Sequence, residues 1–445
     1  MELVNEIVEA RNFWEAWMSV RRNKGAAGID KMSVDVLDVY MPLHMDEIKQ
    51  SICGKQYKPS PVRRVFIPKP NGKQRPLGIP TVVDRLVQQA TAQVLNRIYE
   101  PLFSEHSYGF RPNRSCHQAI NQALDYLNAG YEWVVDFDIE KYFDTVNHDK
   151  LISILREQVN DSATLHLIRS FLKSGVMEGG LVSATTKGVP QGGCISPILS
   201  NIYLDKLDKE LESRELRFVR YADDFDIFVK SERSADRVMA SVSRWLETKL
   251  RLKVSATKTK VVRPTKSVFL GFTFWKSTRG WECRPTDAAK EKLETKVKQV
   301  LVRKRATAQP MSYIFTKLNQ VIRGWVNYYY VGSMATYLRD VFGPWLRHKV
   351  RVVIVKQWKK CSTIYKNLLK IKSIIKSRIT DDAVYRASMT RLGWYRQCGL
   401  STINYLLCPQ VLALPRVNRT DKSKSRPGLV DPYALYQSLR SPICM

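Results

Sequence analysis

The chain has 445 residues, enough for roughly two or three domains, and its 72 Lys and Arg against 42 Asp and Glu give a formal charge of +30. This excess predicts a polyanionic partner, most simply a nucleic acid, with a merely basic soluble protein as the alternative. Eight cysteines without Cys-x-x-Cys spacing argue against a zinc finger, and no apolar run reaches membrane-spanning length, so a cytoplasmic protein that uses no membrane is expected.

The first 285 residues mix helical and extended patterns. Residues 1–22 are predicted to form a helix, which a glycine-containing loop, NKGAAGID at 23–30, follows. The later segments are, in order, a hairpin at 63–80 with PNGK as its turn, a helix at 81–99, a strand running into a turn or short helix at 133–151, a helix at 161–175, a loop entering a long helix at 188–211, a strand pair at 218–229 and an apolar strand at 266–275.

From about residue 285 the pattern is helical. Apolar residues at steps of three or four predict one packed helix face: Ile314, Leu318, Val321, Ile322, Trp325 and Tyr329. FGPW at 342–345 interrupts the pattern, and 416–428 is expected to be a basic loop. Residues 341–445 hold 20 Lys and Arg against 4 Asp, a net +16, so we expect this segment to dock phosphates.

Adjacent carboxylates interrupt the apolar strand pair. Asp223 and Asp224 lie within RYADDFDIFV, and such a pair taken alone is typical of a tight turn. A third carboxylate changes that interpretation, because Asp138 ends the upstream strand WVVDFD and shares a strand face with Asp136. Three carboxylates at neighbouring strand ends could hold two divalent cations for phosphoryl transfer, and Mg²⁺ suits such oxygen ligands.

Several motifs occur together in a fixed order. DFDIEKYFDTVNHD begins at Asp136, GVPQGGCISPILSN begins at Gly188, and YADD begins at Tyr221. SYGFRPNRS lies upstream at 107–115, and FLGF and LNQVIRGWVNYY lie downstream at 269–272 and 318–329. Over nearly its whole length the chain resembles the group II intron-encoded reverse transcriptases, also called maturases.

The resemblance implies roles for particular residues. Asp138, Asp223 and Asp224 would be the catalytic metal ligands for two Mg²⁺ ions, with Mn²⁺ possible, and Asp136 would be structural. Deoxynucleoside triphosphate contacts would come from Lys69, Arg75, Phe143, Gln191 and Lys258, with Phe143 packing under the sugar and rejecting a 2′-hydroxyl. Template or intron RNA contacts would come from Lys24 in the 23–30 loop, from Arg323, and from Lys359, Lys360, Lys422 and Lys424.

The resemblance also implies a fold and a function. The expected fold is an α+β right-hand polymerase, with fingers and an antiparallel palm sheet at 1–285, a helical thumb or maturase domain at 286–375 and a small basic nucleic-acid-binding segment at 376–445. The expected activity is RNA-directed DNA synthesis on an RNA template with a DNA primer, combined with binding of the parent intron RNA, splicing assistance and retrohoming into target DNA. Bound to that DNA, the protein would be associated with the bacterial nucleoid.

Two other functions stay open on the sequence: a reverse transcriptase without an intron partner, domesticated or used in defence, and a splicing factor that only binds RNA. The intact Asp138, Asp223 and Asp224 argue against the second. Many family members end in a nuclease with paired His and Cys, which this chain lacks after His348, so cleavage of the second target strand is not expected. Monomer and dimer are equally open.

Overall fold

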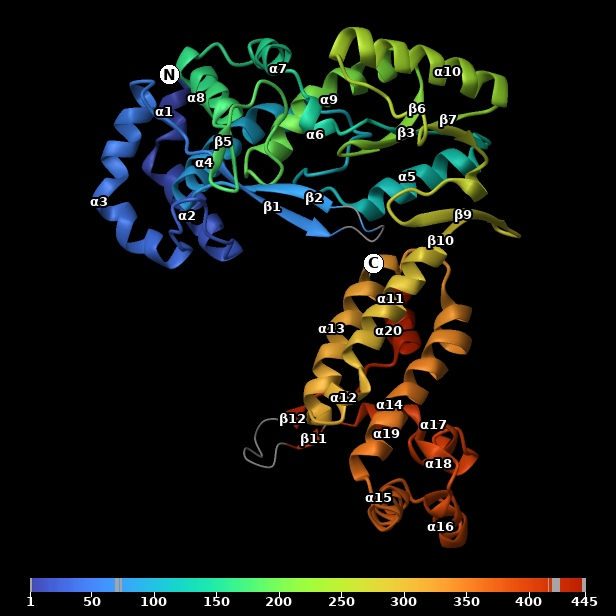
Figure 1. The fold of residues 1–445 in the computed structure, drawn as a ribbon. Coiled ribbons are helices and arrows are strands. Elements are labelled where there is room, and N and C mark those ends of the chain that lie inside the picture. Colours follow the sequence, from blue (N-terminus) through green and yellow to red (C-terminus); the bar gives the residue numbers. More distant parts are fainter. Residues whose placement is uncertain (1, 69–71, 73, 415, 418–424, 442–445) are drawn as a thin grey trace. The chain divides into compact units, whose positions relative to one another are not determined.

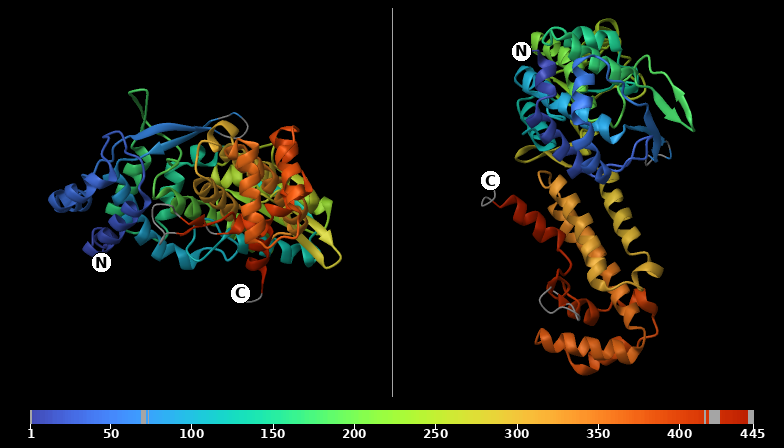
Figure 2. Two further views of the ribbon diagram at one scale, coloured as in Figure 1. Left: turned by 90° about the horizontal axis from the view of Figure 1, so that it is seen from below. Right: turned by 90° about the vertical axis from the view of Figure 1, so that its left-hand side faces the viewer.

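The structure is a computed structural model that describes residues 2–68, 72, 74–414, 416–417 and 425–441. The chain divides into two compact units, Met1–Leu270 and Gly271–Met445, each treated by itself below (Figures 1 and 2). Both units combine helices with antiparallel strand pairs, so the expected α+β class is confirmed.

Helix α4 (Val82–Tyr99) is the centre of the N-terminal helical group. Its start follows from Thr81, whose side chain accepts a hydrogen bond from the Asp84 backbone amide, and twelve of its residues are buried. Helices α1 (Leu3–Ile7), α2 (Ala10–Asn23) and α3 (Val34–Cys53) pack with it around one apolar cluster. The helix predicted at 1–22 is therefore two helices, whereas the one predicted at 81–99 is confirmed.

A four-stranded sheet contains the predicted hairpin. Strands β1 (Val62–Pro68) and β2 (Gln74–Ile79) pair antiparallel as expected from 63–80. Strand β1 also pairs in parallel with β4 (Val176–Glu178), which forms a second hairpin with β5 (Leu181–Ser183). This hairpin was not predicted.

A second sheet, in the order β6-β7-β3-β8, carries the acidic motifs. Its strands are all antiparallel: β3 (Trp133–Asp138), β6 (Arg217–Tyr221), β7 (Asp224–Val229) and β8 (Lys260–Val262). One face is apolar, with Phe137 and Phe225 stacked 4.8 Å apart, and belongs to the same core as α9 (Ser196–Ser213) and α10 (Glu232–Trp245). On the other face Phe228 contacts Tyr126 of α5 (Cys116–Asn128). The strand pair predicted at 218–229 is confirmed.

Further helices complete the first unit: α6 (Tyr142–Thr145), α7 (His148–Leu155) and α8 (Ser162–Lys173). Short 3-10 helices lie at Glu100–Leu102 and Pro264–Lys266, and a π-helical segment at Leu246–Leu250 continues α10. The strand predicted at 266–275 is wrong in its first half. Leu270 and Gly271 both have positive φ, which breaks an extended chain, so the strand begins only at Phe272.

The second unit is almost entirely helical after the hairpin β9 (Phe272–Ser277) and β10 (Gly280–Pro285). Its helices are α11 (Asp287–Val300), α12 (Arg303–Ala306), α13 (Met311–Tyr329), α14 (Gly343–Trp358), α15 (Cys361–Ile374), α16 (Asp381–Met389), α17 (Gly393–Gln397), α18 (Ser401–Leu406), α19 (Pro409–Ala413) and α20 (Pro432–Arg440). The break predicted at 342–345 is wrong, because a π-helical segment at Tyr337–Phe342 continues without interruption into α14 at Gly343. Of the loop predicted at 416–428, Arg416–Val417 (β11) and Ser425–Arg426 (β12) pair as short strands, and 418–424 lies outside the described residues.

A buried ion pair joins the acidic sheet to α9. Arg220, at the end of β6, and Asp208 are both inaccessible to solvent, and the guanidinium donates to both Asp208 carboxylate oxygens. Its third nitrogen, Nη1, donates to Asn201 Oδ1 at 3.1 Å and to the Ala222 carbonyl at 2.9 Å. Arg220 thus holds the turn between β6 and β7 onto the helix.

Removing one partner of this pair should destabilise the fold. Asp208→Asn leaves a buried guanidinium without its counterion, and we expect a loss of about 3–5 kcal/mol in the free energy of unfolding. Chemical denaturation followed by circular dichroism measures it. Asp149→Asn, which breaks the exposed Arg169–Asp149 pair, is the matched control and should cost less than about 1 kcal/mol. Equal small losses in both variants would contradict the role of Arg220.

Candidate active site

Strand register gathers the acidic side chains on one face. In the β3–β7 pairing Asp138 lies opposite Asp224, and Asp136 lies opposite Asp226. Directly opposed residues project to the same side of a sheet, so four carboxylates share the face away from the Phe137–Phe225 stack. Asp223 lies in the adjoining turn, directly after Ala222, whose φ is 60°. The prediction that Asp136 and Asp138 share a face is confirmed.

A close backbone approach supports this turn. Gly109, in the SYGF segment, lies so near the turn that a Cβ there would be 2.3 Å from the Ala222 amide nitrogen. The Asn201 side chain donates to the Gly109 carbonyl at 2.8 Å and accepts from Arg220. Only glycine fits this contact, which explains its place in the motif.

Burial and the charges of neighbouring carboxylates raise the pKa values of Asp223, Asp224 and Asp226. Burial, followed by the charges of Asp136, Asp223 and Asp138, raises the pKa of Asp224 to about 7. Burial and the charge of Asp138 also raise the pKa of Asp223. Asp226 is fully buried, its Oδ1 has no partner among the described residues, and burial raises its pKa well above the usual range. A bound cation would relieve this repulsion.

Two lysines partly neutralise the acidic face. Lys258 Nζ donates to both oxygens of Asp138, at 3.0 and 2.8 Å, and Lys260 Nζ lies 3.3 Å from an Asp136 oxygen. Lys258 was predicted to contact a nucleotide triphosphate, and in this structure it lies on a predicted metal ligand instead. Neither Lys260 nor Asp226 was predicted to be part of the site.

The donor set suits a hard cation such as Mg²⁺, because all three predicted ligands are carboxylates. Among the described residues, however, no three His, Cys, Asp or Glu side chains are gathered closely enough to hold a metal ion. With Lys258 on Asp138, coordination by all three aspartates requires that lysine to leave. The three aspartates therefore provide suitable oxygen ligands for Mg²⁺, provided that Lys258 first leaves Asp138.

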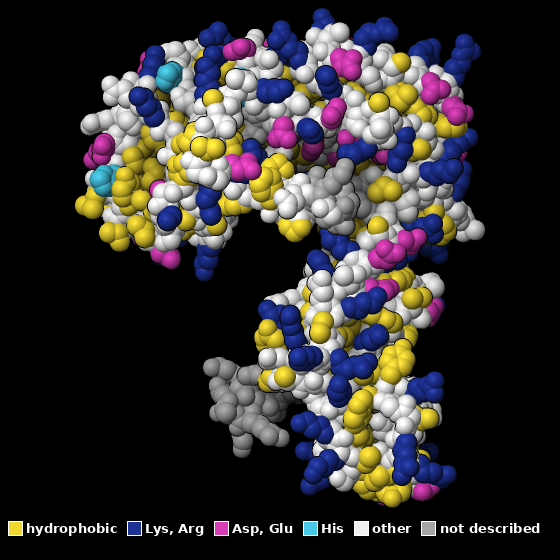
Figure 3. Space-filling view, viewed as in Figure 1, with side chains coloured by type: hydrophobic (Ala, Val, Ile, Leu, Met, Phe, Trp, Pro, Cys, Tyr) yellow, Lys and Arg dark blue, Asp and Glu magenta, His cyan; other side chains and the backbone are white. Residues whose placement is uncertain are grey.

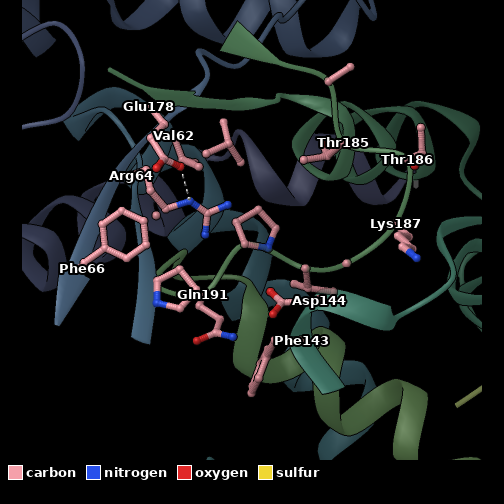
Figure 4. Close-up of a pocket in the computed structure, with 17 residues that line it drawn as sticks. Val62, Arg64, Phe66, Phe143, Asp144, Glu178, Thr185, Thr186, Lys187 and Gln191 are labelled. Carbon is pink, nitrogen blue, oxygen red and sulfur yellow. Dashed lines mark ion pairs between the residues drawn. The ribbon is translucent and has the colours of Figure 1, made fainter. Parts of the chain in front are cut away.

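A cavity of about 440 Å³ lies between strand β1 and the loops that carry Phe143 and Gln191 (Figure 4). Phe143 and Gln191, both predicted nucleotide contacts, line it together with Arg64 and Phe66 of β1. The backbone fixes their loops, since Val189 donates to the Phe143 carbonyl at 2.7 Å and Gly78 donates to the Gln191 carbonyl at 2.7 Å. Phe143 and Gln191 thus lie at one cavity, whereas Arg64, which also lines it, was not among the predicted contacts.

The remaining predicted nucleotide contacts lie on the β1–β2 hairpin. Arg75 is exposed on β2, and its charge acts on Asp223, whose pKa it lowers against the dominant effect of burial. Lys69 lies outside the described residues.

The predicted RNA contacts are distributed over both units. Lys24 is exposed at the end of α2, Arg323 is exposed on α13, and Lys359 and Lys360 are exposed between α14 and α15. Lys422 and Lys424 lie outside the described residues. Trp325, predicted as core, is half-buried, and its indole donates to the Ala289 carbonyl at 3.1 Å.

Two arginines that the sequence did not single out hold the 23–30 loop. Arg85 of α4 donates to the Ala26 carbonyl at 2.6 Å, and Arg63 of β1 donates to the Ala27 carbonyl at 2.7 Å. A single arginine in a helix or a strand does not indicate, from the sequence alone, that its side chain binds the backbone of a distant loop.

Two family models match this chain. Residues 67–274 match "Reverse transcriptase (RNA-dependent DNA polymerase)", and residues 290–372 match "Group II intron, maturase-specific domain". Within the described residues, no helix is long and apolar enough to cross a membrane.

Curated relatives agree with these matches. Protein YkfC of Escherichia coli (strain K12) is 34% identical over 290 residues, which cover 56% of this chain and 76% of that protein. The group II intron-encoded protein LtrA of Lactococcus lactis subsp. cremoris is 40% identical over 209 residues, 47% of this chain and 35% of LtrA. The putative COX1/OXI3 intron 2 protein of Saccharomyces cerevisiae is 34% identical over 251 residues, 56% of this chain and 28% of that protein. The chain thus spans about a third of the length of LtrA and less of the yeast protein.

Metal binding at this face should depend on pH in a defined direction. Asp224 titrates near 7, so below that pH a cation must displace its proton, whereas above it the carboxylate is already ionised. Mn²⁺ affinity, measured by calorimetry, should weaken by up to about tenfold per pH unit below that value and level off above it. Asp224→Asn should remove the part of the pH dependence that is centred near pH 7 and leave only the weaker contribution of Asp223 at lower pH. Equal wild-type affinity on both sides of pH 7 would contradict the raised pKa.

Proposed function

Because this chain belongs to the group II intron reverse transcriptase and maturase family, we propose that it is an RNA-directed DNA polymerase whose active site is Asp138, Asp223 and Asp224. The β3–β7 register carries the proposal, since it sets Asp138 opposite Asp224 with Asp223 in the next turn. The match of residues 67–274 to the reverse transcriptase model covers all three. An RNA template with a DNA primer and deoxynucleoside triphosphates would be the substrates.

The three aspartates would hold two Mg²⁺ ions, or Mn²⁺, which when bound activate the primer hydroxyl and neutralise the triphosphate. Arg75 and Lys69 would bind phosphate oxygens from the hairpin. Lys258 would release Asp138 as the cations bind, and it would then be free to meet the triphosphate. Phe143 and Gln191 line one cavity and would contact the sugar and base, with the ring of Phe143 excluding a 2′-hydroxyl.

Intron RNA is the proposed partner of the second unit. The maturase-specific match at 290–372 supports it, as do the exposed cations Arg323, Lys359 and Lys360. In Figure 3, dark blue Lys and Arg side chains outnumber magenta acidic ones over this unit. Binding there would assist splicing, and DNA synthesis primed at a target site would insert the intron. We further propose the division into fingers and palm at 1–285, thumb at 286–375 and a basic segment at 376–445.

Asp223→Asn tests the catalytic assignment. The substitution removes one metal-ligand charge, so primer extension on an RNA template should fall by more than about 100-fold. RNA affinity and thermal stability should stay close to wild type, because the change acts on the chemical step. Asp236→Asn, on the exposed side of α10, is the matched control and should extend normally. Near-normal extension by Asp223→Asn would contradict the assignment.

Phe143→Ala tests the sugar contact. Loss of the ring opens space for a 2′-hydroxyl, so the kcat/KM for ribonucleotides should rise relative to that for deoxynucleotides. Phe143→Tyr keeps the ring and should retain the discrimination of the wild type. If Phe143→Ala leaves the ratio unchanged, this residue is core packing only.

A further inference from the structure

A second large cavity lies in the helical unit. Helices α11, α12 and α13 border an open cavity of about 650 Å³, within the range of about 300–1,000 Å³ typical of sites for small organic groups. Val300, Ala306, Ile314 and Val321 supply apolar lining. Residues proposed above for metal, nucleotide or RNA binding do not line it.

Only cations provide charge around this cavity. Lys296, Lys304, Arg305 and Lys317 line it, all four are exposed, and no Asp or Glu is among the lining residues. Within the part of the chain that the structure describes, none of the four lies in an ion pair. The nearby Glu294 is engaged by Lys298 at 3.6 Å. A ligand for this site therefore carries negative charge at its edge.

An aromatic ring stands at the opening. Tyr313 lines the cavity and is 51% exposed, and Lys317 Nζ lies 5.7 Å from the centre of its ring. Exposed tyrosines flanked by cations are the usual platform on which nucleic-acid bases stack. An adjoining cavity of about 460 Å³ shares Lys296 and Val321 and adds Lys292 without adding any acidic residue.

These features point to one ligand class. A flat, mostly apolar ring is needed to fill the interior and stack on Tyr313, and anionic groups are needed on both sides of it for the lysines. An acidic peptide would pair with the lysines but would not supply a flat ring for the interior. An unpaired nucleotide satisfies both, with its base inside and its two flanking phosphates on the rim.

We propose that the α11–α13 cavity captures a single unpaired nucleotide of a bound RNA, its base against Tyr313 and its phosphates on Lys304, Arg305 and Lys317. The inference rests on the proposed RNA binding and adds a subsite that reads an extruded base. Such a site favours RNA with a bulge over an uninterrupted duplex.

The test compares three short RNA duplexes by fluorescence anisotropy: fully paired, with one unpaired 2-aminopurine, and with an abasic residue in its place. The wild type should bind the 2-aminopurine bulge about 5- to 100-fold more tightly than the paired duplex, and the abasic duplex should resemble the paired one. Ala308→Trp, which fills the cavity from its exposed rim, should abolish the preference. Ala240→Trp, on exposed α10, is the matched control and should keep it.

Variants of the ring separate stacking from structure. Tyr313→Ala should lose the preference, and Tyr313→Phe should retain it. Replacing Lys304 and Arg305 by Gln should weaken binding of the bulged duplex and flatten its salt dependence by about 0.7–0.9 per lost phosphate contact.

Equal wild-type affinity for the three duplexes, or a bulge preference that survives both Ala308→Trp and Tyr313→Ala, would overturn the site. Wild-type primer extension is the separate readout of the proposed function. A protein that extends primers and binds RNA without a bulge preference refutes this subsite alone. Failure of both extension and RNA binding refutes the proposed function as well.

Discussion

The acidic site depends on one interaction, the buried ion pair between the Arg220 guanidinium and Asp208. Burying a charged guanidinium costs free energy of desolvation. This cost is offset because all three nitrogens of the Arg220 guanidinium donate hydrogen bonds, to Asp208, to Asn201 and to the Ala222 carbonyl. These partners belong to α9 and to the turn before β7. The same pairing therefore fixes the helix, the strand end and the positions from which Asp223 and Asp224 project.

Once the turn is fixed, the sheet register concentrates negative charge. Asp138 faces Asp224 and Asp136 faces Asp226 on one side of the sheet, and the other side of the same strands packs into the apolar core. The outcome is visible in Asp224, whose pKa rises to about 7. In this structure Lys258 supplies part of the missing positive charge at Asp138, and on our account divalent cations take its place.

Patterns within short sequence segments predicted the features that depend only on residues close in the chain. Alternation in WVVDFD placed Asp136 and Asp138 on one face, and turn chemistry placed the hairpin at 63–80. Asp226 was missed although it continues the same alternation from Asp224, because apolar neighbours dominated the interpretation of that strand. The start of β9 was predicted too early, since nothing in FLGF indicates the positive φ of Leu270. Contacts between distant segments, such as Arg85 with the 23–30 loop or the α11–α13 cavity, depend on packing that periodicity does not encode.

The central claim is that Asp138, Asp223 and Asp224 together hold the catalytic cations. The most direct measurement is anomalous X-ray scattering from crystals of the protein with Mn²⁺, a primer annealed to an RNA template and an incoming nucleotide. Our account predicts two peaks bridged by the three carboxylates, with the Lys258 ammonium displaced from Asp138. Peaks elsewhere, or an intact Lys258–Asp138 pair beside a bound nucleotide, would contradict it.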